Sequence, residues 1–277
     1  MSNRRIDEYY APVFAWCRRC VAAFERRPVF IGISGPQGSG KSSLSHHLVH
    51  SFEAESVRAV SISIDDFYLT FDEQRSLASR YPTNRTLELR GYPGTHDVEL
   101  GVRTLESLRN KRPTAIPRYD KSAHQGRGDR LPESAWSMVA PRIEEGVDAA
   151  VDLVIVEGWM LGFRPITATE VDAIDPSLAA PNEFLAAYDA WDSFLDAFIL
   201  LDATSLDDIV TWRVDSERAR RERGETALSD ADARDYIERF LPAYRAYVPA
   251  LRARPIGSRG LYLVLDSDRH PTSIRER

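Results

Sequence analysis

Short apolar runs alternate with amphipathic segments along most of this chain. Five runs have the length and composition of buried strands, at residues 29–34, 59–64, 153–156, 197–201 and 261–265. Segments 43–52, 97–110 and 206–223 instead have the apolar spacing of helices. This alternation is typical of a mainly parallel sheet covered by helices on both faces. The pattern therefore predicts an α/β fold of three layers.

The pattern also indicates how the chain is divided. Residues 1–28 contain one amphipathic segment, 9–24, so we expect an N-terminal helix followed by a single domain over residues 29–277. Residues 69–146 separate the second strand from the third, which is more chain than a simple crossover needs. We expect an insertion there. Residues 164–181 are rich in Pro, Thr, Asp and Ala and are predicted to form an excursion from the sheet or a loop.

The strongest chemical signal follows the first strand. Residues 35–42, GPQGSGKS, match the phosphate-loop (Walker A) pattern G-x-x-x-x-G-K-[ST] in full, with a strand before them and a helix after. Glycines let successive backbone N–H groups point at phosphate oxygens, and the start of the helix adds partial positive charge. The alternative is a Gly/Ser turn that matches by chance. We predict that ATP binds here, through Gly35, Pro36, Gln37, Gly38, Ser39, Gly40, Lys41, Ser42 and Ser43.

A carboxylate at the end of another strand should complete a magnesium site. The third strand ends in Glu157, followed by Gly158. Phosphate-loop proteins more commonly carry Asp at this place, and a Glu that caps a helix or faces solvent is the alternative. We predict that the Ser42 hydroxyl and Glu157 bind Mg²⁺.

Two adjacent acids, Asp65 and Asp66, end the second strand. A carboxylate beside a phosphate loop is well placed to accept a proton from an attacking hydroxyl and to orient that hydroxyl toward the γ-phosphate. By themselves, two acids after a strand more often cap a turn. Beside a complete phosphate loop, Asp65 is the predicted base, and Asp66 serves the metal's water shell or caps the turn.

Several longer strings resemble one group of kinases. DDFY at 65–68, GYPGTHD at 91–97 and PRYD at 117–120 resemble the uridine kinase, pantothenate kinase and phosphoribulokinase superfamily. PRYDKSAH at 117–124, GRGDR at 126–130, EGWMLGF at 157–163 and YDAW at 188–191 resemble its D-glycerate 3-kinase family. The resemblance runs from about residue 29 to the C-terminus. It implies a P-loop kinase-type sandwich with a helical lid, in which the insertion at 69–146 binds the acceptor.

The resemblance also implies an acceptor pocket. Glycerate carries a carboxylate, so its pocket should contain a cation. The candidate cations are Arg90, Arg118, Lys121, Arg127 and Arg130. The groups that would bind hydroxyls and set orientation are Asp66, Tyr68, His96, Asp97, Tyr119 and His124. The alternative for residues 126–130 is a solvated loop without a role in binding.

The lid is expected over residues 206–230. Within the matched pattern, Arg213 is the residue expected to offset charge that develops on the phosphates. The other lid arginines alternate with acids and can form ion pairs on a solvated helix surface; these are Arg218, Arg220, Arg221 and Arg223. Lys41, Asp65 and Arg213 are thus the predicted catalytic residues, and residues 228–244 are expected to be helical scaffold.

The composition of the chain limits the kinds of binding partner that we expect. The net charge of −6 argues against nucleic-acid binding as the main function, and no apolar run is long enough to span a bilayer. Cys17 and Cys20 have C-x-x-C spacing, but no second pair of ligands completes a zinc site, so we expect reduced thiols in a cytoplasmic protein. The partner we expect is a small-molecule acceptor, and the sequence leaves monomer and homodimer equally open.

Three functions remain. The first is a kinase of D-glycerate or a similar hydroxy acid, and the second is a related kinase of a nucleoside, pantothenate or a sugar phosphate. The third is a nucleotide-binding switch or chaperone without an acceptor. A guanine-specific switch usually carries N-K-x-D after a strand, whereas the Asn-Lys pair at 110–111 follows a helix and lacks the Asp.

Overall fold

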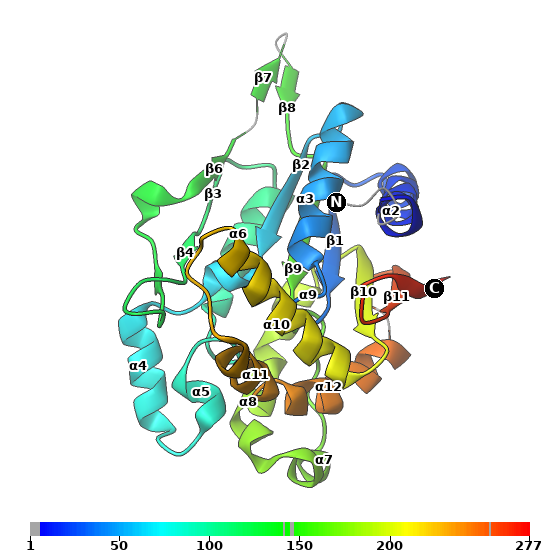
Figure 1. Ribbon diagram of the computed structural model, residues 1–277. Coiled ribbons are helices and arrows are strands. Elements are labelled where there is room, and N and C mark those ends of the chain that lie inside the picture. The colour runs from blue at the N-terminus through cyan, green and yellow to red at the C-terminus, as the bar shows by residue number, and fades with distance from the viewer. Residues whose placement is uncertain (1–5, 141, 145–146, 255) are drawn as a thin grey trace.

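A six-stranded sheet forms the centre of the computed structural model, which describes residues 6–140, 142–144, 147–254 and 256–277 (Figure 1). Its strands lie in the order β12-β11-β10-β1-β9-β2. Strands β11 and β12 pair antiparallel, and the other neighbours pair in parallel. The strands are β1 (Val29–Ser34), β2 (Ala59–Ser63), β9 (Leu153–Gly158), β10 (Ala197–Ala203), β11 (Arg259–Leu265) and β12 (Pro271–Glu276).

The mainly parallel α/β sheet is confirmed. Strands β1 and β9 are buried along their whole length, which explains their continuous apolar sequence. Strand β12 was not predicted, because its sequence PTSIRE is largely polar and lies exposed at the edge of the sheet. Parallel pairing brings the carboxyl ends of β1, β9 and β2 to one edge, so the residues that follow these strands become neighbours.

Helices cover both faces of the sheet, with α3 in front of the central strands and α6 behind them in Figure 1. The main helices are α2 (Ala11–Ala23), α3 (Lys41–Ala54), α4 (Phe71–Arg80), α6 (Val98–Arg109), α7 (Ala168–Ile174), α8 (Ala179–Phe184), α10 (Leu206–Glu222), α11 (Asp230–Glu238) and α12 (Leu241–Ala253). Single turns are α5 (Arg85–Glu88), α9 (Asp189–Asp192), the π-helical η1 (Ile6–Tyr10) and the 3₁₀ turns η2 (Ile64–Phe67), η3 (Glu133–Ala135), η4 (Pro176–Leu178) and η5 (Leu185–Tyr188). Among the described residues, no helix combines the length and the apolar character needed to cross a bilayer.

The N-terminal helix α2 packs into the core of the main domain. Val13, Cys17 and Cys20 are buried, and the ring of Phe14 lies 4.9 Å from that of Phe52 on α3. Burial raises the pKa of the Cys17 thiol and raises that of Cys20 to about 11. Thiols with raised pKa values form little of the reactive thiolate at neutral pH.

The segment 164–181, which the sequence composition predicts to be a loop, contains helices instead. Thr167 and Glu170 form a reciprocal capping box that starts α7, and the Asp175 side chain caps the following turn η4. The prediction was wrong because composition alone hides these two caps, which satisfy the free N–H groups at the start of each helical piece.

The insertion between β2 and β9 combines short helices with small hairpins. The paired strands are β3 (Thr114–Ile116) with β6 (Ser137–Val139), β4 (Tyr119–Asp120) with β5 (Asp129–Arg130), and β7 (Arg142–Glu144) with β8 (Val147–Ala149).

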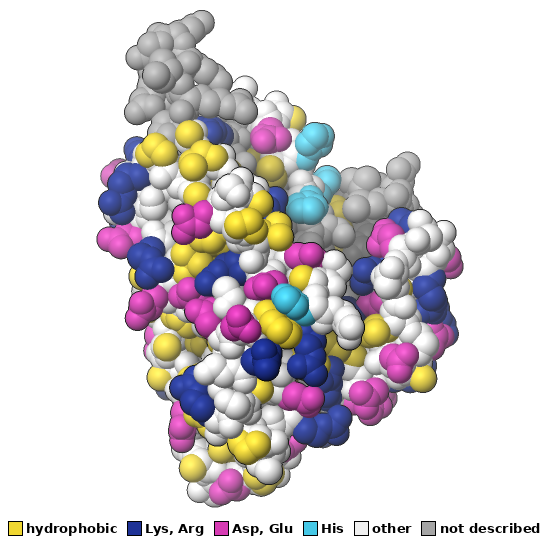
Figure 2. Space-filling model, turned by 90° about the vertical axis from the view of Figure 1, so that its left-hand side faces the viewer, with side chains coloured by type: hydrophobic (Ala, Val, Ile, Leu, Met, Phe, Trp, Pro, Cys, Tyr) yellow, Lys and Arg dark blue, Asp and Glu magenta, His cyan; other side chains and the backbone are white. Residues whose placement is uncertain are grey.

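Acidic and basic side chains are interspersed over the face that carries α4, as Figure 2 shows. This face therefore presents no extended surface of one charge sign.

Candidate active site

The phosphate loop connects β1 to α3. Gly38 and Gly40 have φ angles of 82° and 93°, which side chains rarely adopt. A Cβ at Gly38 would lie 2.8 Å from the backbone of Trp212 on α10, so the loop also needs glycine for this close approach. Helix α3 begins at Lys41, and the first N–H groups of such a helix are free to bind an anion. The local geometry is that of a phosphate cradle.

Lys41, Ser42 and Glu157 lie together at the cradle. The Lys41 ammonium donates to the Pro36 carbonyl at 2.9 Å, and the Ser42 hydroxyl donates to Glu157 Oε1 at 2.9 Å. Burial lowers the pKa of Lys41, although the charges of Glu157 and Asp65 oppose this shift. Ser42 and Glu157 thus present two adjacent oxygen atoms, a donor set that suits a Mg²⁺ ion already bound to phosphates and water.

Asp65 lies at the end of β2 with both carboxylate oxygens engaged. Oδ1 accepts a hydrogen bond from the Tyr68 hydroxyl at 2.9 Å, and Oδ2 lies 2.6 Å from the Lys121 ammonium. Burial alone would raise the pKa of the Asp65 carboxyl, but the charge and hydrogen bond of Lys121 lower it to about 2. Asp65 is therefore fully ionised at neutral pH.

Asp66 has a different environment. Burial raises the pKa of its carboxyl to about 6, against the opposing effects of Arg118 and the Tyr119 backbone N–H. Oδ1 accepts from Tyr119 N at 3.3 Å, and Oδ2 lies 3.7 Å from the Arg118 guanidinium. Asp66 thus ties the η2 turn, which follows β2, to the β4 strand of the insertion.

His96 is buried behind Tyr68. The two rings stack with centroids 4.3 Å apart, and His96 Nδ1 hydrogen-bonds the Tyr188 hydroxyl at 2.9 Å. Burial lowers the pKa of His96 to about 3, so the imidazole is neutral. Within the described part of the chain, its Nε2 has no hydrogen-bond partner. A buried nitrogen without a partner is costly, and a bound ligand would satisfy it.

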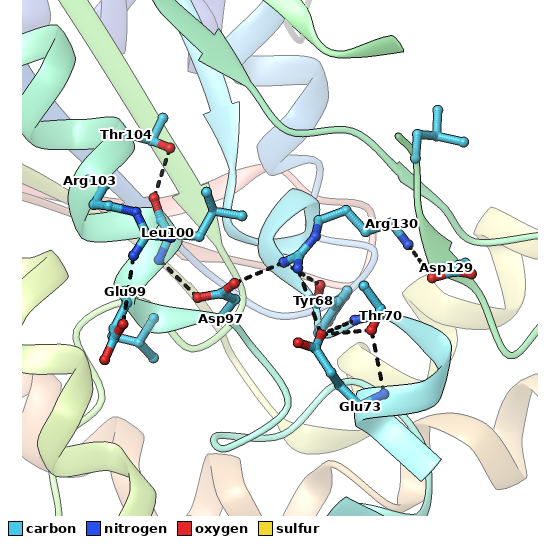
Figure 3. A network of polar contacts seen from close by, with 12 residues as sticks. Tyr68, Thr70, Glu73, Asp97, Glu99, Leu100, Arg103, Thr104, Asp129 and Arg130 are labelled. Carbon is cyan, nitrogen blue, oxygen red and sulfur yellow. Dashed lines mark hydrogen bonds and ion pairs between the residues drawn. The ribbon is translucent and has the colours of Figure 1, made fainter. Parts of the chain in front are cut away.

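Asp97 and Arg130 belong to a polar network beside this group (Figure 3). The Asp97 side chain caps α6 by accepting from Leu100 N at 2.9 Å, and its other oxygen lies 3.2 Å from the Arg130 guanidinium. Arg130 also lies 3.7 Å from Glu73 on α4. Both predicted substrate residues are engaged in holding α4, α6 and β5 together.

The remaining predicted acceptor residues lie around the loop that joins β4 to β5. Arg90 donates to the Gly126 carbonyl at 2.8 Å and to the Lys121 carbonyl at 3.2 Å, and its guanidinium lies over the Tyr119 ring. His124 stacks on Phe71, whereas Arg127 is exposed. The structure thus brings Lys121, Tyr68 and His96 to Asp65, while Arg90 and His124 hold the loop.

The arginines of the predicted lid form ion pairs with acids of the same part of the chain. Arg213 lies 2.5 Å from the buried Glu217 and 4.6 Å from the centroid of the Tyr236 ring. Arg218 and Arg221 pair with Asp230, and Arg220 and Arg223 pair with Glu225. In this conformation the guanidinium of Arg213 contacts Glu217 of the same helix and Tyr236 of α11.

Two residues from the C-terminal third contact the cradle without having been predicted. The Tyr244 hydroxyl hydrogen-bonds the side chain of Gln37, and Arg269 donates to the carbonyls of Gly38 at 2.7 Å and Trp212 at 3.0 Å. Arg269 has a φ angle of 64° in the turn between β11 and β12. The sequence offers a signal only for Arg269, because this residue stands in a short polar stretch that directly follows the predicted strand at 261–265.

Comparison with known proteins agrees with this arrangement. The model of the phosphoribulokinase/uridine kinase family matches residues 30–165. The chain is 39% identical over 284 residues to the chloroplastic D-glycerate 3-kinase of Arabidopsis thaliana, covering 96% of this chain and 60% of the plant protein. It is also 34% identical to an uncharacterized kinase of Schizosaccharomyces pombe, covering 89% of this chain and 91% of that protein.

A solved structure shares the whole fold. The D-glycerate 3-kinase from Cryptococcus neoformans var. grubii superposes with a TM-score of 0.83, covering 100% of both chains at 24% sequence identity. At that identity the likeness concerns the fold, including the mainly parallel sheet and its helical layers.

Proposed function

Because the chain belongs to the phosphoribulokinase/uridine kinase family of P-loop kinases, we propose that it transfers the γ-phosphoryl group of ATP to a hydroxyl of a small acidic metabolite, D-glycerate. The observation that carries this proposal is the pair of Asp65 and Lys121, a carboxylate and an ammonium group 2.6 Å apart. D-glycerate offers one group to each of them. Its hydroxyl suits Asp65, and its carboxylate suits Lys121.

The cradle residues bind the nucleotide and the metal. Backbone N–H groups of the loop and the Lys41 ammonium would bind the phosphates. Ser42 and Glu157 would hold Mg²⁺, which offsets charge on the β- and γ-phosphate oxygens when bound. The hydrogen bond between Ser42 and Glu157 keeps their oxygens 2.9 Å apart before any metal arrives.

Asp65 orients the attacking hydroxyl and takes its proton. Phosphoryl transfer needs little covalent chemistry from the protein, so orientation is the larger part of this role. While Lys121 is paired with Asp65, the low pKa of the carboxyl makes it a weak base. An acceptor carboxylate that draws Lys121 away weakens this pair and raises the proton affinity of Asp65. In this scheme the acceptor activates its own base.

We expect D-glycerate to be phosphorylated faster than uridine. The cluster of Arg118, Lys121 and Arg127 offers positive charge that a neutral nucleoside does not need, and Arg118 and Lys121 keep more than half of their side chains exposed, 52% and 58%. The measurement is ADP release with D-glycerate, L-glycerate, uridine, pantothenate and ribulose 5-phosphate. Faster turnover of uridine would refute the hydroxy-acid assignment and leave the kinase family in place.

Lys121→Met is expected to raise the KM for D-glycerate and to leave the KM for ATP nearly unchanged.

Glu157→Gln is expected to raise the Mg²⁺ concentration needed for half-maximal rate by about 10–100-fold, the range seen when groups around a metal are altered. The amide keeps the size of the side chain and removes the charge that attracts the ion. Initial rates against total Mg²⁺ at saturating ATP measure the effect, and Glu183→Gln, an exposed acid on α8, is the control. An unchanged magnesium dependence would remove Glu157 from the metal site.

Arg213→Ala is expected to lower kcat by about 10²-fold and to weaken ATP binding much less when no acceptor is present. The reason is that a lid contact strengthens only in the closed state. Arg223→Ala, which removes the exposed pair with Glu225, serves as the control. If kcat stays at the wild-type value, Arg213 only stabilises the lid through Glu217.

A further inference from the structure

A cavity of about 260 Å³ lies on the β10 side of the phosphate loop. Ser34, Gly35 and Pro36 form one wall, the end of β10 forms the floor, and α10 and α12 close the sides. Asp65 follows β2, which is separated from β1 by β9 on the other side of the loop. The described residues that line the cavity include none of the predicted acceptor-binding residues. The cavity is therefore distinct from the acceptor pocket.

The inner wall of the cavity is apolar and partly aromatic. It is formed by Trp159, Phe163, Leu201, Ile209 and Val248, all of them buried or nearly so. A space of this kind suits a ring or a compact branched hydrocarbon, because such walls gain dispersion contacts and lose no hydrogen bonds.

Some polar groups of the cavity have hydrogen-bond or ion-pair partners, and others do not. Arg252 donates to Asp202 Oδ1 at 2.9 Å, so these two charges compensate each other. Arg245 lines the cavity at its solvent-exposed side, and within the described ranges it makes no hydrogen bond or ion pair. The Ser34 hydroxyl is 1% exposed and lacks a partner among the described residues. The cavity thus offers one uncompensated cation and one buried hydroxyl beside an apolar wall.

We propose that this cavity binds a small carboxylic acid with a ring-sized apolar body, and that the bound acid restrains the lid. The carboxylate would pair with Arg245, and the apolar body would lie against Trp159 and Phe163. A cation would be repelled by Arg245, and a neutral apolar molecule would leave that charge unused.

The position of the cavity explains the effect on the lid. Its walls include Ser205 and Ile209 at the start of α10, Val248 on α12, and Gly35 of the cradle. Figure 1 shows α10 running diagonally across the molecule, with its lower right end close to α12. A molecule held between these elements fixes their spacing. Because lid movement limits turnover in many kinases, occupation of the cavity should lower kcat.

Phenylacetate is the probe, and phenylacetamide is its neutral counterpart of nearly equal shape. Calorimetric titration of the full chain should show that phenylacetate binds at least about tenfold more tightly than phenylacetamide, as expected for one charge-assisted contact. Arg245→Gln should remove this preference, and Arg254→Gln, an exposed arginine just beyond α12, should preserve it. Val248→Phe should block both probes by filling the cavity.

The same titrations with a non-hydrolysable ATP analogue present should give an unchanged affinity. In assays, phenylacetate should lower kcat and leave the KM for ATP unaltered. The proposal is overturned if neither probe binds, if Arg245→Gln binds phenylacetate like the wild type, or if the ATP analogue displaces the probe. Saturating phenylacetate without any effect on kcat would refute the link to the lid.

Discussion

Asp65→Asn is expected to lower kcat by about 10²–10⁴-fold, the usual contribution of a positioned general base, and to leave the affinity for ATP nearly unchanged. Asn keeps the size of the side chain and can still accept the hydrogen bond from Tyr68. It cannot take a proton, and it loses the ion pair with Lys121. Steady-state rates at saturating ATP and acceptor measure the change.

Asp66→Asn is the matched control because the two acids are neighbours in the η2 turn that follows β2. Asp66 contacts the backbone of Tyr119 and the side chain of Arg118, so its variant should lose much less activity. If Asp66→Asn is inactive while Asp65→Asn works, the two roles are reversed. If both remain active, positioning by the metal and the lid carries the reaction without a base.

The pH profile separates the same two assignments. Burial raises the pKa of Asp66 to about 6, so a reaction that needs its ionised carboxylate would slow as the pH falls through 6. The pKa of Asp65 is about 2 in the protein without acceptor, so no such loss is expected from the base in kcat/KM near pH 6. A loss near pH 6 in the wild type, together with an inactive Asp66→Asn, would assign the base to Asp66.

Lys41→Ala is expected to lower turnover by about 10²–10³-fold or more and to weaken ATP binding, because it removes a buried positive charge from the predicted phosphate site. The Lys41 ammonium donates to the Pro36 carbonyl and contributes little to the apolar core, so the fold should be retained. Thermal unfolding monitored by circular dichroism checks the fold, and isothermal titration measures ATP binding.

Lys111→Ala removes an exposed lysine outside the cradle and serves as the control. A Lys41→Ala protein with nearly normal rates would show that the loop at 35–42 does not bind the transferred phosphate.

The parts of the site that lie on one continuous segment could be predicted from the sequence. The phosphate loop is such a segment, since its glycines, Lys41 and the flanking strand and helix are all local. Asp65 and Glu157 were also accessible, because an apolar run that ends in an acid marks the carboxyl end of a strand. Parallel pairing then places Ser63 beside Glu157 in the register of β2 and β9.

Contacts between distant segments could not be predicted in the same way. Lys121 reaches Asp65 across 56 residues, and Tyr188 reaches His96 across 92. The sequence around Lys121 or Tyr188 does not indicate which residue each will contact, because these contacts depend on how the insertion folds over the end of β2. The low pKa of Asp65 and the neutral state of His96 follow from these pairings and from burial, so they too were inaccessible.

The turn between β11 and β12 has a practical consequence. Protein engineers commonly insert labels or tags into short polar hairpin turns near the end of a chain, since such turns tolerate change. Here the turn supplies Arg269, whose guanidinium joins the Gly38 carbonyl to the Trp212 carbonyl, 231 and 57 residues away along the chain. A label at this turn would therefore report on a perturbed enzyme, and fluorophores for following lid motion are better attached elsewhere.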